Sequence, residues 1–280
     1  MGKGGIIIKK GINLWCFPME WSLKSKLKLA SEAGFSGIEL NLEETGAFSM
    51  ETNLTGVKGV QKLVSSYNLE ITSISTSLLW KYPITDNDPE IREIAKTIIR
   101  KMLLFAKILA IDTILIVPGV VDAEVSYDQA YERSKDILRE LAEDAKECKV
   151  SIAIENVWNK FLLSPLEMKG FIEEIQSEYI RVYFDVGNIL NYGYPEQWIS
   201  ILGPLIKKVH VKDFKTEIGN IHGFTSLFHG DVNWYKVMQA LRTIKYNDYI
   251  TAEIMPSLEP EKMIYEISHS MDELIKGGQI

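Results

Sequence analysis

The stretch "RVYFDVGN", residues 181–188, has the pattern of a buried strand that ends in an acidic residue. Val182 and Phe184 give one apolar face, because side chains two apart on a strand point the same way. The opposite face ends in Asp185, and the chain then turns at Gly187. The stretch therefore raises the question of what a carboxylate does at the end of an interior strand.

Short β-rich runs alternate with longer amphipathic segments eight times along the 280-residue chain. The expected strands are Gly11–Trp15, Gly37–Leu42, Glu70–Thr76, Thr113–Pro118, Ser151–Val157, Arg181–Val186, Lys208–Phe214 and Tyr249–Ile254. The expected helical segments are 22–34, 55–68, 89–110, 127–148, 165–177, 195–206, 233–245 and 259–276. No Gly/Ser/Pro-rich linker divides the chain. We therefore predict an α/β fold, a (β/α)8 TIM barrel that forms a single domain over residues 1–280, with residues 1–10 as a lead-in segment.

Composition narrows the classes of function. The chain has a net charge of −7 and no long basic block, which disfavours a nucleic-acid partner. No run of eighteen apolar residues exists, so no membrane-spanning helix is expected. The run Ile6–Ile8 is too short for the apolar core of a secretory signal. Cys16 and Cys148 are far apart in the sequence, and two isolated thiols favour a cytoplasmic location.

Four consecutive expected strands end on residues that commonly bind metals. They are "SIAIEN" with Glu155, "RVYFDVGN" with Asp185, "KKVHVKDF" with His210 and "YITAEI" with Glu253. In each strand the alternation directs the apolar residues toward the helices and the polar residue into the barrel. All four residues lie near the carboxyl end of their strand, which is the face where barrel enzymes build their active sites.

Three carboxylates in one small volume would repel one another, and a divalent cation removes that repulsion. Oxygen ligands with one imidazole suit Mn²⁺, Co²⁺, Mg²⁺ or Zn²⁺, and the absence of thiolates argues against a structural zinc site. Taken singly, each residue is better explained as a helix cap, an ion-pair partner or a packed core histidine. The shared face and the shared end of four neighbouring strands favour a metal site.

With these motifs the chain resembles the xylose-isomerase-like barrels, a superfamily of sugar and sugar-phosphate isomerases and epimerases. The similarity is greatest to ketose and ketose-phosphate 3-epimerases of the L-xylulose-5-phosphate and D-tagatose types. It covers about residues 11–275 and is carried by "IEN", "FDVGN", "HVKDF", "GDVNW" and "AEI". The resemblance implies that Glu155, Asp185, His210 and Glu253 bind one divalent ion, with Mn²⁺ as the first choice. It also implies that Glu155 and Glu253 are the catalytic residues.

The chain departs from the family pattern at two positions. Many relatives have a histidine in the motif D-x-x-H, where this chain has Asn188. Tagatose-type epimerases have an arginine shortly after the metal-binding histidine, where this chain has Lys212 and Lys215. The first change argues against a multinuclear site and against the endonuclease IV branch. Together, the two changes leave the substrate open.

Five side chains are candidates for binding the substrate. By strand parity Glu39 and Lys212 face the interior, and Asn188 occupies the position of the family histidine. Trp15 at the end of the first strand can pack against a sugar ring, and His229 lies in a long loop that can cover the site. Packing around the site accounts for the positions of Glu39 and Trp15 equally well. Lys212 can instead pair with Asp185, and His229 can simply be a solvated histidine of the loop.

These inferences predict a cytoplasmic, metal-dependent isomerase of carbohydrate metabolism. It would invert C3 of a ketose or ketose phosphate by removing and returning a proton through a metal-stabilised enediolate. An aldose–ketose isomerase on the same site is the alternative, followed by a polyol-ketone dehydratase and an endonuclease IV-like nuclease. The expected partner is a small-molecule sugar or sugar phosphate, and assembly into a homo-oligomer is left open.

Overall fold

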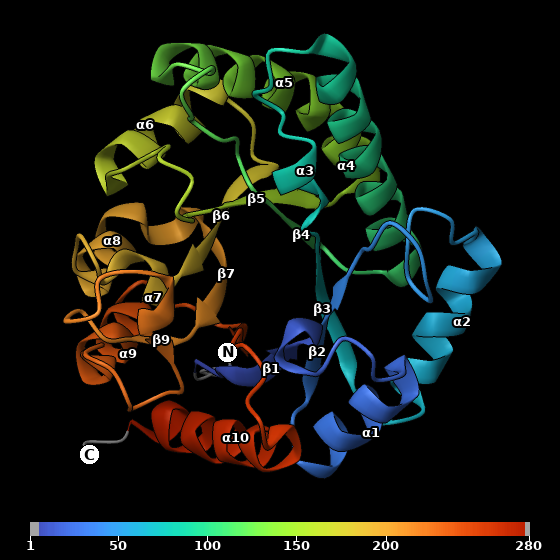
Figure 1. Cartoon of the computed structure of the whole chain (residues 1–280), viewed down its shortest axis with the longest axis vertical. Helices are drawn as coiled ribbons and strands as arrows, with labels where there is room; N and C mark the ends of the chain where they lie inside the picture. The colour runs from blue at the N-terminus through green and yellow to red at the C-terminus, as the bar shows by residue number, and fades with distance from the viewer. Residues whose placement is uncertain (1–5, 278–280) are drawn as a thin grey trace, which may run out of the picture.

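A closed barrel of eight parallel strands forms the centre of the molecule, with helices around it (Figure 1). The computed structural model describes residues 6–277. The barrel strands are β1 (Lys9–Asn13), β2 (Gly37–Asn41), β3 (Glu70–Ser75), β4 (Thr113–Ile116), β5 (Ser151–Glu155), β6 (Ile180–Asp185), β7 (Ile206–Val211) and β10 (Tyr249–Ala252). Strand β10 pairs with both β7 and β1, which closes the sheet. The prediction of a (β/α)8 barrel is confirmed.

The helices follow the strands in chain order and cover the outer face of the barrel (Figure 1). They are α1 (Leu23–Glu32), α2 (Leu54–Ser65), α3 (Leu78–Lys81), α4 (Pro89–Leu109), α5 (Tyr127–Cys148), α6 (Pro165–Ile175), α7 (Val186–Ile189), α8 (Pro195–Leu202), α9 (Trp234–Thr243) and α10 (Pro260–Lys276). No helix within residues 6–277 has both the length and the apolarity needed to cross a bilayer.

Helix α4 shows why these segments are helical. Asp88 accepts a hydrogen bond from the Glu90 backbone N–H, and Pro89 occupies the first turn, where no backbone donor is needed. Residues at helical spacing, among them Ile98, Met102 and Phe105, are buried against the barrel. Each such side chain contributes about 1.5–3 kcal/mol when it is fully buried. The apolar stripe therefore fixes which face of the helix meets the sheet.

The structure differs from the sequence prediction at several strand ends. Strand β1 begins at Lys9, so the last two residues of the expected lead-in belong to the sheet, while residues 1–5 of that lead-in lie outside the described residues. The strand expected to continue to Phe214 ends at Val211. Beyond it, β8 (Asp213–Phe214) pairs with β9 (Phe224–Thr225) as a separate hairpin. The helices α3 and α7 were not predicted, because single helical turns leave too little periodicity in the sequence.

Side-chain alternation along the strands separates two environments. The main apolar core lies between the strands and the helices, whereas Leu115, Ala153 and Tyr183 form a small cluster of their own. Along the barrel interior and toward the carboxyl ends of the strands, several buried residues are polar or charged. They include Asn13, Glu39, Ser73, Ser75, Glu155, Asp185 and His210. This polar end of the barrel is where a site can form.

Candidate metal centre and active site

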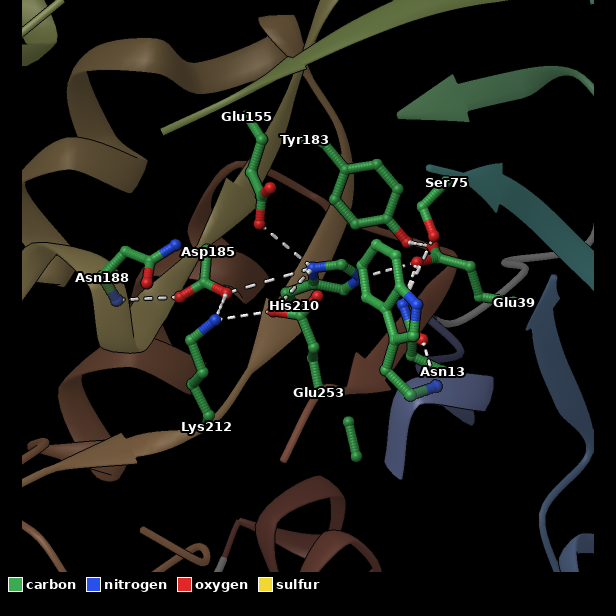
Figure 2. A network of polar contacts seen from close by, with 12 residues as sticks. Asn13, Glu39, Ser75, Glu155, Tyr183, Asp185, Asn188, His210, Lys212 and Glu253 are labelled. Atoms are coloured by element: carbon green, nitrogen blue, oxygen red, sulfur yellow. Dashed lines mark hydrogen bonds and ion pairs between the residues drawn. The ribbon is translucent and has the colours of Figure 1, made fainter. Parts of the chain in front are cut away.

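Four ligand-type side chains meet at the carboxyl ends of β5, β6, β7 and β10 (Figure 2). One ligand atom from each of Glu155, Asp185, His210 and Glu253 lies within 4.8 Å of the others. His210 is central: its Nδ1 lies 3.3 Å from Glu155 Oε1, 3.6 Å from Glu253 Oε2 and 3.9 Å from Asp185 Oδ2. Glu253 directly follows β10, and its backbone N–H donates to Val211 O of β7 at 3.2 Å. The structure thus brings together the four residues that the strand pattern singled out.

The electrostatics of this cluster favour a bound cation. Asp185 Oδ2 is buried, and the only charged donor close to it among the described residues besides His210 is the Lys212 ammonium at 2.8 Å. Burial raises the pKa of Asp185, and the neighbouring Lys212 opposes that rise. Burial also raises the pKa of Glu155 to about 7, with Glu253 and Asp185 adding repulsion. In their ionised form these carboxylates are destabilised by burial and by mutual repulsion. A divalent ion would offset both the cost of burying their charge and the repulsion between them.

The donor set also fits a divalent ion by its chemistry. Three carboxylates and one imidazole nitrogen are ligands that Mn²⁺, Mg²⁺, Co²⁺ and Zn²⁺ accept. Asp185 is fixed in place, because its Oδ1 accepts from the Asn188 N–H at 2.8 Å. Its backbone is held by Asn156, which accepts from the Asp185 N–H at 2.9 Å and donates to the Asp185 carbonyl at 2.7 Å. Asn156 is the last residue of "IEN", and its role was not predicted.

Residues 27–274 match the family described as Xylose isomerase-like TIM barrel. The chain belongs to this family. Among curated proteins, it is similar to the L-ribulose-5-phosphate 3-epimerase UlaE of Salmonella typhimurium, with 26% identity over 197 residues and coverage of 68% of each chain.

Solved structures of this xylose isomerase-like type share the fold. D-Psicose 3-epimerase from Clostridium cellulolyticum H10, solved with D-tagatose, superposes with a TM-score of 0.79 at 17% identity, covering 95% of this chain and 97% of that chain. The probable 3-DHS dehydratase AsbF of Bacillus anthracis superposes with a TM-score of 0.78 at 18% identity, covering 95% and 99%. At these identities the likeness concerns the fold alone.

In this xylose isomerase-like barrel, Lys212 contacts the acidic cluster directly. Its Nζ lies 2.8 Å from Asp185 Oδ2 and 2.6 Å from Glu253 Oε2, and only 12% of the side chain is exposed. Burial alone would lower the pKa of Lys212, but the charges of Asp185 and Glu253 hold it above its ordinary value. The lysine was predicted to bind substrate or to pair with Asp185, and the structure shows that ion pair together with a second one to Glu253.

Glu39 lies on the other side of the His210 ring from the acidic cluster. Its Oε1 is 3.0 Å from His210 Nε2, and its Oε2 accepts from Ser73 Oγ at 2.5 Å and from the Tyr183 hydroxyl. Despite burial, the contact with His210 and the hydrogen bonds from Ser73 and Tyr183 lower the pKa of Glu39 to about 2. Both oxygens of Glu39 therefore face protein donors, as the alternative of packing around the site would have it, and contact of Glu39 with substrate stays a prediction.

The remaining substrate candidates lie in different surroundings. Asn188 is buried, and its side-chain amide donates to Asn156 O at 3.0 Å, so part of its hydrogen-bonding capacity holds the strand end. Trp15 is partly buried, with its Nε1 3.5 Å from Glu43 Oε1. His229 is exposed in the segment after β9. These contacts leave the role of each residue in substrate binding as a proposal.

The motif "GDVNW" shapes the loop that follows the strand of His210. Buried Asp213 accepts from the Phe214 N–H at 2.9 Å, the Val232 N–H at 3.1 Å and Trp234 Nε1 at 2.9 Å. A Cβ atom on Gly230 would collide with Asp213 and with the Phe214 backbone. The motif thus fastens both ends of the segment 215–231. It was quoted for the family resemblance, and its structural role became visible only in the fold.

Proposed function

We propose that this chain is a divalent-metal-dependent sugar epimerase that inverts C3 of a ketose or ketose phosphate. The observation that carries the proposal is the placement of two glutamates in one cluster. Glu155 and Glu253 come from strands separated in the barrel by β6 and β7, yet both lie within 3.6 Å of His210 Nδ1. The epimerases among the similar proteins support the same assignment.

Inverting a carbon next to a ketone requires a proton to leave one face of the sugar and to return to the other. Glu155 and Glu253 supply one carboxylate for each face, so the substrate need not turn over between the two steps. A divalent ion held by Glu155, Asp185, His210 and Glu253 would act as a Lewis acid toward the substrate oxygens. Mn²⁺ is the proposed ion, with Co²⁺, Mg²⁺ and Zn²⁺ as alternatives.

The position at which solvent hydrogen enters the sugar tests this proposal. Ketopentoses, ketohexoses and their phosphates are incubated with Mn²⁺-reconstituted protein in D₂O and followed by NMR. We expect the C3 epimer of one of these sugars to accumulate with deuterium at C3. Deuterium at C1 would identify an aldose–ketose isomerase instead and would refute the assignment of C3.

A dehydratase is the second candidate, because the fold is also shared with the probable 3-DHS dehydratase AsbF. Loss of water from a cyclic polyol ketone, with formation of a conjugated product, would favour it. The endonuclease IV-like alternative would require cleavage of a duplex with an abasic site. Neither activity is expected from a site built around two opposed glutamates.

We further propose that Lys212 orients Glu253 and offers an N–H to a substrate oxygen. Lys212→Met removes the ammonium from Glu253, and we expect kcat/KM to fall about 10- to 100-fold, an effect of 1.4–2.7 kcal/mol in the usual conversion. Lys215→Met, on the other side of β8, is the control and should keep near-wild-type kinetics. Unchanged kcat/KM in Lys212→Met, at a preserved melting temperature, would contradict this role.

Trp15, Asn188 and His229 remain proposed contacts for the sugar. A cytoplasmic location, the lack of a nucleic-acid partner and assembly into a homo-oligomer likewise remain predictions from the sequence.

A further inference from the structure

Glu39 belongs to the half of the barrel that contributes no ligand to the acidic cluster, and it contacts His210 (Figure 2). The His210 ring lies between two sets of carboxylates. Its Nδ1 faces Glu155, Asp185 and Glu253, and its Nε2 faces Glu39 of β2 at 3.0 Å. Both His210 and Glu39 have no exposed surface, and the 3.0 Å separation is a direct contact between them.

The Glu39 carboxylate is held by donors from three other strands. Asn13 of β1 donates to Oε1, while Ser73 of β3 and Tyr183 of β6 donate to Oε2. Asn13 is itself held, because its Oδ1 accepts from Asn41 Nδ2 at 3.0 Å. Tyr183 reaches Glu39 from the far wall of the barrel, so the carboxylate is fixed from opposite sides. It cannot turn away from His210 without breaking several buried hydrogen bonds.

An ionised carboxylate only accepts hydrogen bonds, so the ring nitrogen that faces Glu39 must carry the proton. In neutral imidazole the other nitrogen then has the free lone pair. That nitrogen is Nδ1, and it points at the three acidic groups, where a lone pair is favourable only if a cation lies between them.

We propose that Glu39 is a positioning residue that fixes His210 as the Nε2–H tautomer and so presents Nδ1 to the metal ion. The inference rests on the metal site of the proposed function. It assigns to β1, β2 and β3 a role beyond scaffolding: they set the orientation and the protonation of a ligand that belongs to β7. Hydrogen bonds of this kind to metal-bound histidines typically account for 10- to 100-fold in metal affinity.

The substitution Glu39→Gln tests the proposal with little change in volume. Because Ser73 and Tyr183 both donate to the Oε2 position, the glutamine carbonyl belongs there, which turns its NH₂ group toward His210 Nε2. His210 must then accept at Nε2, and its proton moves to Nδ1. We expect Mn²⁺ affinity, measured by calorimetry, to fall about 10- to 100-fold. Glu70→Gln is the matched control, because Glu70 is also a strand carboxylate that accepts from a tyrosine, Tyr249, and it should bind Mn²⁺ like the wild type.

A measurement on the wild-type protein covers the case in which Glu39→Gln fails to fold. In the Zn²⁺-loaded protein, ¹⁵N–¹H correlation NMR of the histidine rings should show the His210 proton on Nε2 and a metal-bound Nδ1. Unchanged Mn²⁺ affinity in folded Glu39→Gln would overturn the inference while leaving the metal site intact. A proton on Nδ1 would overturn the inference and would also remove His210 Nδ1 from the ligands of the ion. Failure of the wild-type protein to bind any divalent ion would overturn the proposed function as well.

Discussion

Glu253→Gln and Glu155→Gln are each expected to lower kcat for C3 epimerisation about 10³-fold, because a positioned general base typically contributes 10²- to 10⁴-fold. Glutamine keeps the shape of the side chain and a carbonyl oxygen, but it cannot accept the substrate proton at neutral pH. Steady-state kinetics on the active ketose measures the loss. Mn²⁺ content, determined in parallel, separates loss of the base from loss of a ligand.

Isotope exchange gives this prediction a sharper form. If the two glutamates serve opposite faces, each variant retains the base for one face only. In D₂O, Glu253→Gln should exchange the C3 hydrogen of one epimer without converting it, and Glu155→Gln should do so for the other epimer. Wild-type turnover in both variants would show that the bases are assigned wrongly. The same conclusion would follow if one variant lost exchange with both epimers while the other variant kept it. Glu70→Gln, at the amino end of β3 and so away from the cluster, serves as the control.

Removal of the divalent ion is expected to abolish epimerisation and to lower the free energy of unfolding by about 4 kcal/mol, relative to protein with free ion at a thousand times its Kd. The loss arises because Glu155, Asp185 and Glu253 then face one another with Lys212 as the nearest counter-charge. Thermal unfolding with EDTA and with graded Mn²⁺ measures it. An equal melting temperature under both conditions would contradict a cation in this cluster.

The same experiment has a predictable pH dependence. In the metal-free protein the pKa of Glu155 is raised to about 7, so the folded state binds a proton more tightly than the unfolded state does. Its contribution to stability is therefore present below pH 4.5 and is lost as the pH rises to about 7, an effect of roughly 3 kcal/mol. A bound ion requires the ionised carboxylate, so the gap in melting temperature between loaded and metal-free protein should widen over that interval.

The sequence predicted the parts of the fold that depend on local periodicity. Strand alternation placed Glu155, Asp185, His210 and Glu253 on the inner face, and the barrel topology then brought them to one end. That inference needed no knowledge of side-chain conformation, because the carboxyl ends of neighbouring parallel strands necessarily meet.

The role of Glu39 could not be predicted in the same way. Its contact with His210 joins positions 171 residues apart, and its partner Tyr183 crosses the barrel interior. Strand alternation showed that Glu39 faces inward. It did not show whether the carboxylate oxygens of Glu39 contact a ligand or a histidine. The hairpin β8–β9 was missed for a related reason, since it depends on bonds from Asp213 to residues that come about twenty positions later.

The anchoring of the segment 215–231 has a consequence for how such a barrel can diversify. Asp213 accepts hydrogen bonds from Phe214 at one end of the segment and from Val232 and Trp234 at the other. The residues between them therefore form a loop whose two ends are held together. Exchanging their sequence should leave the geometry of His210 untouched. Evolution or a protein engineer can therefore replace the sequence between these two anchors and so change which substrate is accepted. The arrangement of Glu155, Asp185, His210 and Glu253 would stay the same.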